Sequence, residues 1–214
     1  MALRQLALTS RPIQIRKRDL AIAIQKVNPH PKPSVALEQY TIPADLAAEI
    51  LFTACFAYND IQEKCVLDLG TGTGRLALGA SILGAKTVVG VDIDALSIRA
   101  AAQSAKVLRE EVSWVVGDIG IIRGSFDTVV MNPPFGTKQP HTDIEFLQCA
   151  QNLASVTYSI HKSSTRKFLG HWLEKQALKG ERIMNTKMAI PHQFSFHRKA
   201  KRFVEVDVFR ILRT

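Results

Sequence analysis

The sequence predicts an α/β fold in which helices cover both faces of a mostly parallel, seven-stranded, Rossmann-like sheet. Three observations support this prediction. Short apolar runs alternate along the chain with segments that carry apolar residues at helical spacing, as in strand–helix–strand units. A glycine-rich turn follows the first apolar run, where a strand would meet a helix. An aspartate or asparagine lies at or just after the end of each of the first four apolar runs, and the carboxyl ends of parallel strands meet at one edge of a sheet.

The predicted elements can be placed in order along the chain. Strands are expected at 65–69, 87–91, 112–116, 126–131, 155–159 and 204–210. Helices are expected at 13–27, 43–56, 75–83, 95–108, 144–153 and 164–178. Three prolines within 29–33 cannot continue a helix, so this segment is a predicted stiff linker. We therefore expect a basic helical extension at 1–28 and a single main domain at 29–214.

The composition limits the kind of protein this can be. The 214 residues suit one well-filled core. The formal net charge of +9 favours a polyanionic partner such as nucleic acid, and basic residues cluster at 16–18 and 197–202. No apolar run reaches the ~18 residues of a membrane span, and arginines interrupt the N-terminus, so a cytoplasmic protein is expected. The three cysteines form no CxxC pair and predict neither disulfides nor a metal site.

The glycine-rich turn at 68–74 is the first candidate binding site. Its sequence, DLGTGTG, permits a tight turn and lets a ligand approach the backbone at an electropositive helix N-terminus. NAD and S-adenosylmethionine both fit such a turn, but the spacing GxGxG differs from the dinucleotide pattern GxGxxG, which weakens the case for NAD. A glycine turn without a ligand is the remaining alternative. The candidate cofactor contacts of this turn are Asp68, Gly70, Gly72 and Gly74.

Two further aspartates follow the second and third predicted strands. Asp92 can accept hydrogen bonds from both ribose hydroxyls of a nucleoside cofactor. Asp118 can accept from the amino group of an adenine, and Ile119 can offer a backbone contact there. Asp118 alone would also suit a helix N-cap or a turn. Three acids after three successive strands support a cofactor site more strongly than any one of them.

The segment Asn-Pro-Pro-Phe after the fourth predicted strand is the candidate catalytic motif. Its prolines make a rigid, extended turn. The Asn132 side-chain oxygen and the Pro133 carbonyl can each accept an N–H of a substrate amino group, which turns the nitrogen lone pair out of conjugation and towards a methyl donor. Phe135 offers a flat face on which a flipped-out base can stack. The predicted catalytic residues are Asn132, Pro133, Pro134 and Phe135.

Five segments together resemble the methyltransferase-like protein 5 family, over about residues 33–211. They are LEQY at 37–40, DLGTGTG at 68–74, VDID at 91–94, MNPPFGTK at 131–138 and SIHKSS at 159–164. NPPF alone is shared with glutamine and guanine-N2 methyltransferases, whereas its combination with LEQY and HKSS is much more specific.

The resemblance implies a Rossmann-like class I methyltransferase that uses S-adenosyl-L-methionine and methylates adenine N6 in small-subunit rRNA. It implies that Asn132 to Phe135 hold the adenine. The implied cofactor contacts are Gln39, Gly70, Asp92, Asp118 and Ile119. One position departs from the family: Ile42 stands where a threonine hydroxyl usually helps to hold the cofactor.

The family also implies two macromolecular partners. A small zinc-binding activator protein would add a strand to the edge of the sheet at 112–116, and the alternative for Trp114 there is packing under a helix. RNA would contact basic residues in the last third of the chain. The candidate RNA contacts are His161, Lys162, Arg198, Lys199, Lys201 and Arg202.

Other functions fit part of the pattern. A guanine-N2 RNA methyltransferase or a glutamine-N5 protein methyltransferase would use the same Asn-Pro-Pro chemistry, and the basic charge argues against the second. A nicotinamide-dependent oxidoreductase is disfavoured by the glycine spacing. A catalytically silent RNA-binding subunit is disfavoured by the intact NPPF.

Overall fold

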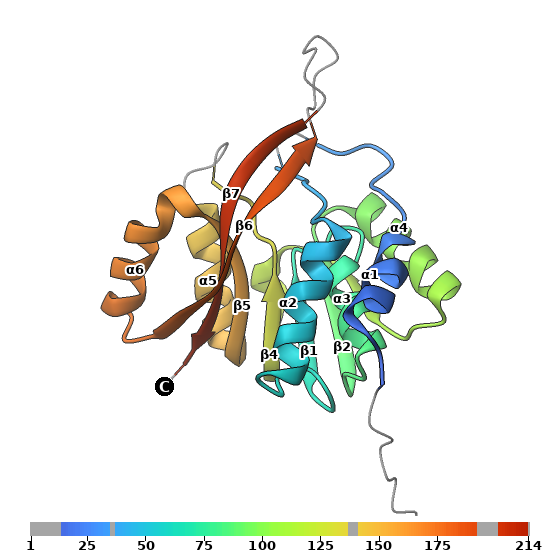
Figure 1. The fold of residues 1–214 in the computed structure, drawn as a ribbon, viewed down its shortest axis with the longest axis horizontal. Coiled ribbons are helices and arrows are strands. Elements are labelled where there is room, and N and C mark those ends of the chain that lie inside the picture. The colour runs from blue at the N-terminus through green and yellow to red at the C-terminus, as the bar shows by residue number, and fades with distance from the viewer. Residues whose placement is uncertain (1–13, 35–36, 137–140, 192–200, 214) are drawn as a thin grey trace, which may run out of the picture.

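The computed structural model describes residues 14–34, 37–136, 141–191 and 201–213, without the side chains at 190, 191, 201 and 202. Seven strands of the described chain form one sheet in the order β3-β2-β1-β4-β5-β7-β6 (Figure 1). The strands are β1 (Cys65–Leu69), β2 (Thr87–Asp92), β3 (Ser113–Val116), β4 (Phe126–Met131), β5 (Ala154–Lys162), β6 (Lys179–Pro191) and β7 (Lys201–Leu212). The helices are α1 (Lys17–Gln25), α2 (Ala44–Phe56), α3 (Arg75–Ile82), α4 (Ala95–Leu108), α5 (Thr142–Leu153) and α6 (Arg166–Lys175), with short 3-10 turns η1 (Ile119–Ile121) and η2 (Ser163–Thr165).

The sheet is parallel from β3 to β5 and antiparallel at its other end. β1 pairs with β2 and β4, β2 pairs with β3, and β4 pairs with β5, all in parallel. β7 runs antiparallel to both β5 and β6. The predicted mostly parallel sheet is confirmed, and the carboxyl ends of β1 to β4 meet at one edge, where ligands bind in sheets of this kind.

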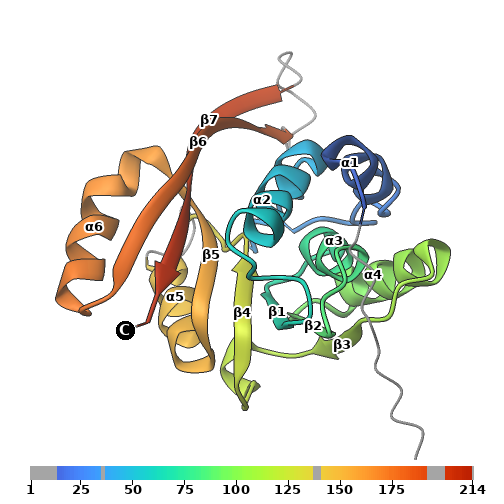
Figure 2. The same ribbon diagram turned by 60° about the horizontal axis from the view of Figure 1, so that its bottom comes forward.

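Apolar clusters cover both faces of the sheet. Successive residues of a strand point to opposite faces, and the neighbours Val66 and Leu67 of β1 accordingly belong to different clusters. The first cluster joins the sheet to α1, α2 and α3, and a small cluster adds α4. The second cluster joins the sheet to α5 and α6. Figure 2 shows α1 to α4 on one side of the sheet and α5 and α6 on the other.

The N-terminal helix is built into the first cluster. Leu20 and Ile24 of α1 are fully buried together with residues of α2 and α3. The proline-rich segment that follows is tied to α4, because the Asn28 N–H donates to Ser104 Oγ at 3.0 Å. The division into an extension at 1–28 and a domain at 29–214 stays a prediction. No helix of the described residues has the length and apolar character needed to cross a bilayer.

The predicted bounds of β1, β4 and α4 are those of the structure, whereas one strand was missed. β6 covers 179–191, for which no strand was expected. Its sequence, KGERIMNTKMAIP, is rich in polar residues, as suits an edge strand beside solvent. A register shift between Arg182 and Met184 also interrupts its alternation, so the period-2 signal of a strand is broken.

Candidate active site

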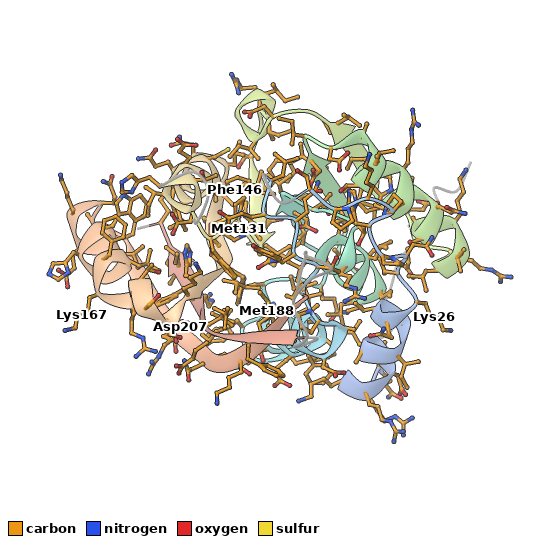
Figure 3. All side chains as sticks on the ribbon, turned by 90° about the horizontal axis from the view of Figure 1, so that it is seen from above. Lys26, Met131, Phe146, Lys167, Met188 and Asp207 are labelled. Atoms are coloured by element: carbon orange, nitrogen blue, oxygen red, sulfur yellow. The ribbon has the colours of Figure 1, made fainter. Side chains whose placement is uncertain are left out.

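A cavity of about 450 Å³ lies at the carboxyl ends of β1 to β4. Residues after each of these strands line it, and the segment before α2 lines it as well. In Figure 3, which views the molecule from above, Met131 at the end of β4 lies near the middle of the picture. Phe146 of α5, which lines the cavity, lies beside it in the same apolar cluster. The structure thus brings the predicted cofactor turn and the predicted catalytic motif to one cavity.

The glycine turn between β1 and α3 has the backbone that its sequence predicts. Gly72 has a φ of +55°, and a Cβ added there would meet nothing within 4 Å, so the turn leaves room for a ligand. Gly70 also lines the cavity. Gly74 serves packing, because a Cβ there would lie 2.7 Å from the Trp114 ring. The sequence alone did not separate these roles.

Asp92 connects the end of β2 to this turn. Its two carboxylate oxygens accept from the Gly72 N–H at 2.8 Å and from the Asp94 N–H at 2.9 Å. Burial raises the pKa of the Asp92 carboxyl, and the two backbone N–H groups oppose that effect. Each oxygen keeps a further lone pair, so Asp92 can still accept from ribose hydroxyls.

Asp118 and Ile119 lie at the same cavity, as predicted. The Asp118 carboxylate caps η1 by accepting from the Gly120 N–H at 2.8 Å, and its side chain is otherwise exposed. Its capping role therefore coexists with a position beside the cavity. Ile119 is half-buried, and its carbonyl accepts a hydrogen bond from the Cys149 thiol.

Gln39 holds the segment before α2 in place over the cavity. Its amide oxygen accepts from the Ser34 N–H at 2.6 Å, and its amide nitrogen donates to Asp94 Oδ2 at 2.8 Å. His30 Nε2 lies 2.6 Å from the same Asp94 oxygen. Since the Lys32 N–H donates to His30 Nδ1, the His30 proton is on Nε2 and is donated to Asp94. His30 and Asp94 were not predicted as site residues. His30 belongs to no motif, and Asp94, although it is part of VDID, acts through contacts with residues 55 and 64 positions away.

Asn132 lies between the segment before α2 and the cavity. Its Nδ2 donates to the Tyr40 carbonyl at 3.2 Å, which fixes the amide so that Oδ1 is the free end. That Oδ1 is buried and has no hydrogen-bond partner. A buried acceptor without a partner is costly, and it marks the place where a donor of a ligand would bind.

The rest of the NPPF turn is held from the same segment. Glu38 Oε2 accepts from the Phe135 N–H at 2.9 Å. Phe135 is only 8% exposed, lies 6.4 Å from the Tyr40 ring centre to centre and has Lys162 Nζ 5.6 Å from its ring centre. Tyr40 and Pro134 line the cavity. The aromatic face presented to the cavity is therefore that of Tyr40, with Phe135 packed beside it; the sequence reasoning missed Tyr40 although it belongs to LEQY.

The predicted RNA contact at His161 is wrong. His161 is 1% exposed, and its Nε2 lies 2.8 Å from the buried Ser159 Oγ. Its Nδ1 lies 3.4 Å from Asp143 Oδ2. Burial is the largest single influence on the Asp143 carboxyl and favours a higher pKa, but the interactions with His161 and two backbone hydrogen bonds together lower the pKa. His161 thus fastens the end of β5 to the start of α5 and leaves no edge for a phosphate.

The other predicted partner contacts have mixed outcomes. Arg198 and Lys199 lie outside the described residues, as do the side chains of Lys201 and Arg202. Trp114 packs inward, against Gly74 and Gly90, so its ring has a structural role. The strand that carries it, β3, is an edge strand as predicted.

Nearly the whole chain is similar to known proteins. Residues 53–132 match the family model of the ribosomal protein L11 methyltransferase (PrmA). The rRNA N(6)-adenosine-methyltransferase METTL5 of Danio rerio is 37% identical over 209 residues, covering 94% of this chain and 100% of the relative. An uncharacterized Methanocaldococcus jannaschii protein is 39% identical over 209 residues, covering 92% and 94%. A crystal structure from Pyrococcus horikoshii superposes with a TM-score of 0.86 at 36% identity, covering 94% and 100%. With this identity over nearly its full length, the chain belongs to the METTL5 family of methyltransferases.

Proposed function

We propose that this protein methylates the N6 amino group of an adenosine in structured RNA, and that small-subunit rRNA carries this adenosine. The observation that carries the proposal is the Asn132 amide, whose buried Oδ1 has no partner and lies at the cavity that the glycine turn also lines. The named relatives from fish, fly and nematode are rRNA N(6)-adenosine-methyltransferases, which supports the choice of substrate.

The residues around the cavity fit S-adenosylmethionine. Gly72 leaves the backbone open, Asp92 has lone pairs for the ribose, and Asp118 and Ile119 line the same cavity, where they would meet the adenine. Gln39 contributes by holding the segment over the cavity. When bound, the cofactor supplies an electrophilic methyl group on a sulfonium.

The chain's own residues prepare the amino group of the substrate. Asn132 Oδ1 accepts one N–H and the Pro133 carbonyl accepts the other, so the nitrogen lone pair turns away from the ring. Tyr40 supplies the face beside which the base lies. Since both acceptors are neutral, the pair does not remove the proton in advance, and catalysis depends on placement.

The identity of the labelled nucleoside tests this proposal. Purified protein is incubated with methyl-labelled S-adenosylmethionine and unmodified small-subunit rRNA, and the digested nucleosides are separated. Label in N6-methyladenosine that Asn132→Ala abolishes is the expected result. Label in N2-methylguanosine would replace adenine by guanine as the substrate. In a parallel reaction with protein substrates, label in glutamine would point to the glutamine-N5 alternative.

We also propose that RNA phosphates are bound by basic residues in the last third of the chain. Lys162 lies beside Phe135, Lys201 and Arg202 are the first two residues of β7, and Arg198 and Lys199 precede that strand in the sequence. The candidates are Lys162, Arg198, Lys199, Lys201 and Arg202. Removing them one at a time should weaken all RNAs alike and reduce the slope of log affinity against log salt by about one per lost phosphate contact. An unchanged slope would exclude that residue as a phosphate contact.

A small zinc-binding activator is the second proposed partner, and it would extend the sheet beyond β3. Val116 at the end of β3 is 52% exposed, and Ile121 in the turn after it is 54% exposed. An apolar edge strand of this kind is a surface for strand addition. Val116→Lys should abolish co-purification with the activator and leave the isolated protein folded. Co-purification retained in Val116→Lys would exclude the β3 edge as the surface that binds the activator.

A further inference from the structure

Two exposed aromatic rings lie together where α5 and α6 begin. His141, the residue before α5, and Phe168 in the first turn of α6 have ring centres 6.0 Å apart, with ring planes inclined by 41°. Phe168 is 48% exposed, whereas the next residue, Leu169, is buried in the apolar core. His141 is exposed as well. The pair is therefore not part of the core, and its rings offer flat faces to a ligand from solvent.

The aromatic pair adjoins the cavity through a short series of neighbouring residues. Thr142 follows His141 directly and lines the cavity. His161 fastens the start of α5 to the end of β5. Lys162 comes next, and its Nζ lies 5.6 Å from the centre of the Phe135 ring in the NPPF turn. A polymer whose reacting unit lies in the cavity can therefore reach the aromatic pair with a neighbouring unit.

Two arginines beside the pair share one buried acid. Arg166 at the start of α6 donates from Nε and Nη2 to Asp207 at 2.7 and 2.8 Å, and Arg182 Nη1 lies 3.8 Å from the same carboxylate. The two arginine side chains remain 43% and 44% exposed. The hydrogen bond to Asp207 is the main cause that raises the pKa of the Arg166 guanidinium, and the charge of Glu205 adds to it. The two arginines are thus balanced by two acids.

Two lysines add positive charge beyond this balance. Lys167, which precedes Phe168, is exposed, and Figure 3 shows it on α6 at the left edge of the molecule. Lys162 lies on the side of the cavity. Neither lysine takes part in the ion pairs found among the described residues. Cations beside aromatic faces are complementary to single-stranded nucleic acid, in which phosphates alternate with flat bases.

The proposed reaction creates a need for such a surface. A base has to leave its stack before it can enter the cavity, so its neighbours in the RNA lose a stacking partner. Aromatic side chains replace that partner in proteins that bind unpaired RNA.

We propose that the rings of His141 and Phe168 stack a base that flanks the target adenosine in the RNA, and that Lys167 binds a phosphate of the same stretch. This inference rests on the proposed function, because it takes RNA as the substrate, and it adds a base contact outside the reaction cavity. The contact favours targets in unpaired segments, since a base within a duplex stays stacked on its own neighbours.

Binding of short RNAs with a missing base tests the contact. The probe is a uridine oligonucleotide with one central adenosine, and in each of its variants one base on either side of the adenosine is removed to leave an abasic residue. Stacking on an aromatic side chain contributes about 5- to 100-fold to affinity for each base. The wild-type protein should lose about tenfold in affinity when the base that meets the pair is absent, and much less at the other positions.

Variants of the pair assign the contact to its rings. Phe168→Leu removes the flat face but keeps an apolar side chain, and it should weaken the intact probe about tenfold. Removal of the flanking base should then have no further effect, because both changes delete the same contact. Phe168→Trp keeps a flat face and should bind like wild type. His141→Asn suits the φ of +69° at this position and should weaken binding about threefold.

Further measurements separate the base contact from the phosphate contact. Phe168→Leu should leave the slope of log affinity against log salt unchanged, whereas Lys167→Gln should reduce it by about 0.7. With small-subunit rRNA as substrate, Phe168→Leu should raise KM about tenfold and change kcat less than twofold. Phe56→Leu is the matched control, because Phe56 is 47% exposed and lies 4.4 Å from a second ring, that of Phe52, but at the end of α2. It should change none of these quantities.

The outcomes separate this inference from the proposed function. Unchanged probe affinity and unchanged KM in Phe168→Leu, or losses that add to those of every missing base, would overturn the base contact. Unchanged affinity together with a lower mass of Phe168→Leu in light scattering would assign the rings to a contact between copies of this chain. In both cases N6-methyladenosine formed in rRNA would leave the proposed function intact. A wild-type protein that neither binds these RNAs nor methylates rRNA would overturn the proposed function as well.

Discussion

The two walls of the cavity are built from different kinds of groups. The wall formed by β1, β2 and the start of α3 carries the charged side chains Asp68, Arg75 and Asp92. The wall formed by the turn after β4 and the segment before α2 presents the neutral Asn132 amide and the Tyr40 and Pro134 side chains, although Glu38 and Glu145 also line the cavity. Charged groups suit a ligand that is itself charged, whereas neutral acceptors suit an uncharged amino group.

The difference between the two walls also predicts which variants change cofactor binding and which change the rate of the reaction. Under the proposed function, the groups of the charged wall find their partners as soon as the cofactor binds, so they would contribute to affinity. The Asn132 amide would align the reacting nitrogen and have its largest effect in the transition state. Variants of the first wall should therefore change dissociation constants, and variants of the second should change kcat.

The largest expected effect is on the neutral wall. Asn132→Ala removes the unpartnered acceptor and should lower kcat by about 100-fold or more, as removal of one positioned hydrogen-bonding group commonly does. The dissociation constant of S-adenosylhomocysteine should stay within about twofold. Single-turnover methylation and calorimetry measure the two quantities. Asn152→Ala, which changes an exposed asparagine of α5, is the control and should affect neither. A large loss of cofactor affinity in Asn132→Ala would contradict the separation of the walls.

The next effect is on the charged wall. Asp92→Ala leaves the Gly72 and Asp94 N–H groups without acceptors and removes the ribose contact, so cofactor affinity should fall about 100-fold. Asp92→Asn keeps one acceptor oxygen and should cost about tenfold. At saturating cofactor, kcat of both variants should remain near that of wild type. A fall in kcat with unchanged affinity would place Asp92 in the chemical step instead.

A smaller effect is expected where the segment before α2 joins the two walls. Glu38 Oε2 holds the Phe135 N–H, and Glu38 itself has a positive φ of 48°, as the sharp bend of this segment requires. Glu38→Ala should lower kcat about tenfold, because the NPPF turn loses one of its anchors. Glu38→Gln keeps an acceptor oxygen and should lower kcat only about twofold. Equal losses in the two variants would mean that the charge, and not the hydrogen bond, holds the turn.

Much of the fold followed from local patterns. The central strands β1, β4 and β5 are largely buried on both faces and bounded by turns, so their apolar runs are distinct. The NPPF turn and the glycine turn were recognised because each is a contiguous motif at a strand end. β6 was missed since its strand character depends on pairing with β7 and is interrupted by a bulge.

The missed site residues share a different cause. Arg75, Tyr40, Glu38 and Asp94 act through contacts across 33 to 97 positions of the chain, or through the absence of a partner. Such contacts leave no periodic signal in the sequence. His161 shows the opposite error, because a basic residue in a basic segment suggested RNA, whereas the end of β5 turns it into the interior.

The smallest expected effect is a pH dependence that only the charged wall has. The pKa of Asp68 is raised to about 7, whereas an unfolded aspartate titrates near 3.9. Between these values the folded protein holds a proton that the unfolded chain has released, so the free energy of unfolding falls as the pH rises and levels off above about 7. In the absence of cofactor, wild type should therefore lose more Tm between pH 5 and pH 8 than Asp68→Asn does, by roughly 5 °C for a domain of this size. Asn132→Ala, on the neutral wall, should follow the wild-type curve. Parallel curves for wild type and Asp68→Asn would show that Asp68 is already ionised at pH 5, and the buried acid would then have a cation partner before any ligand binds.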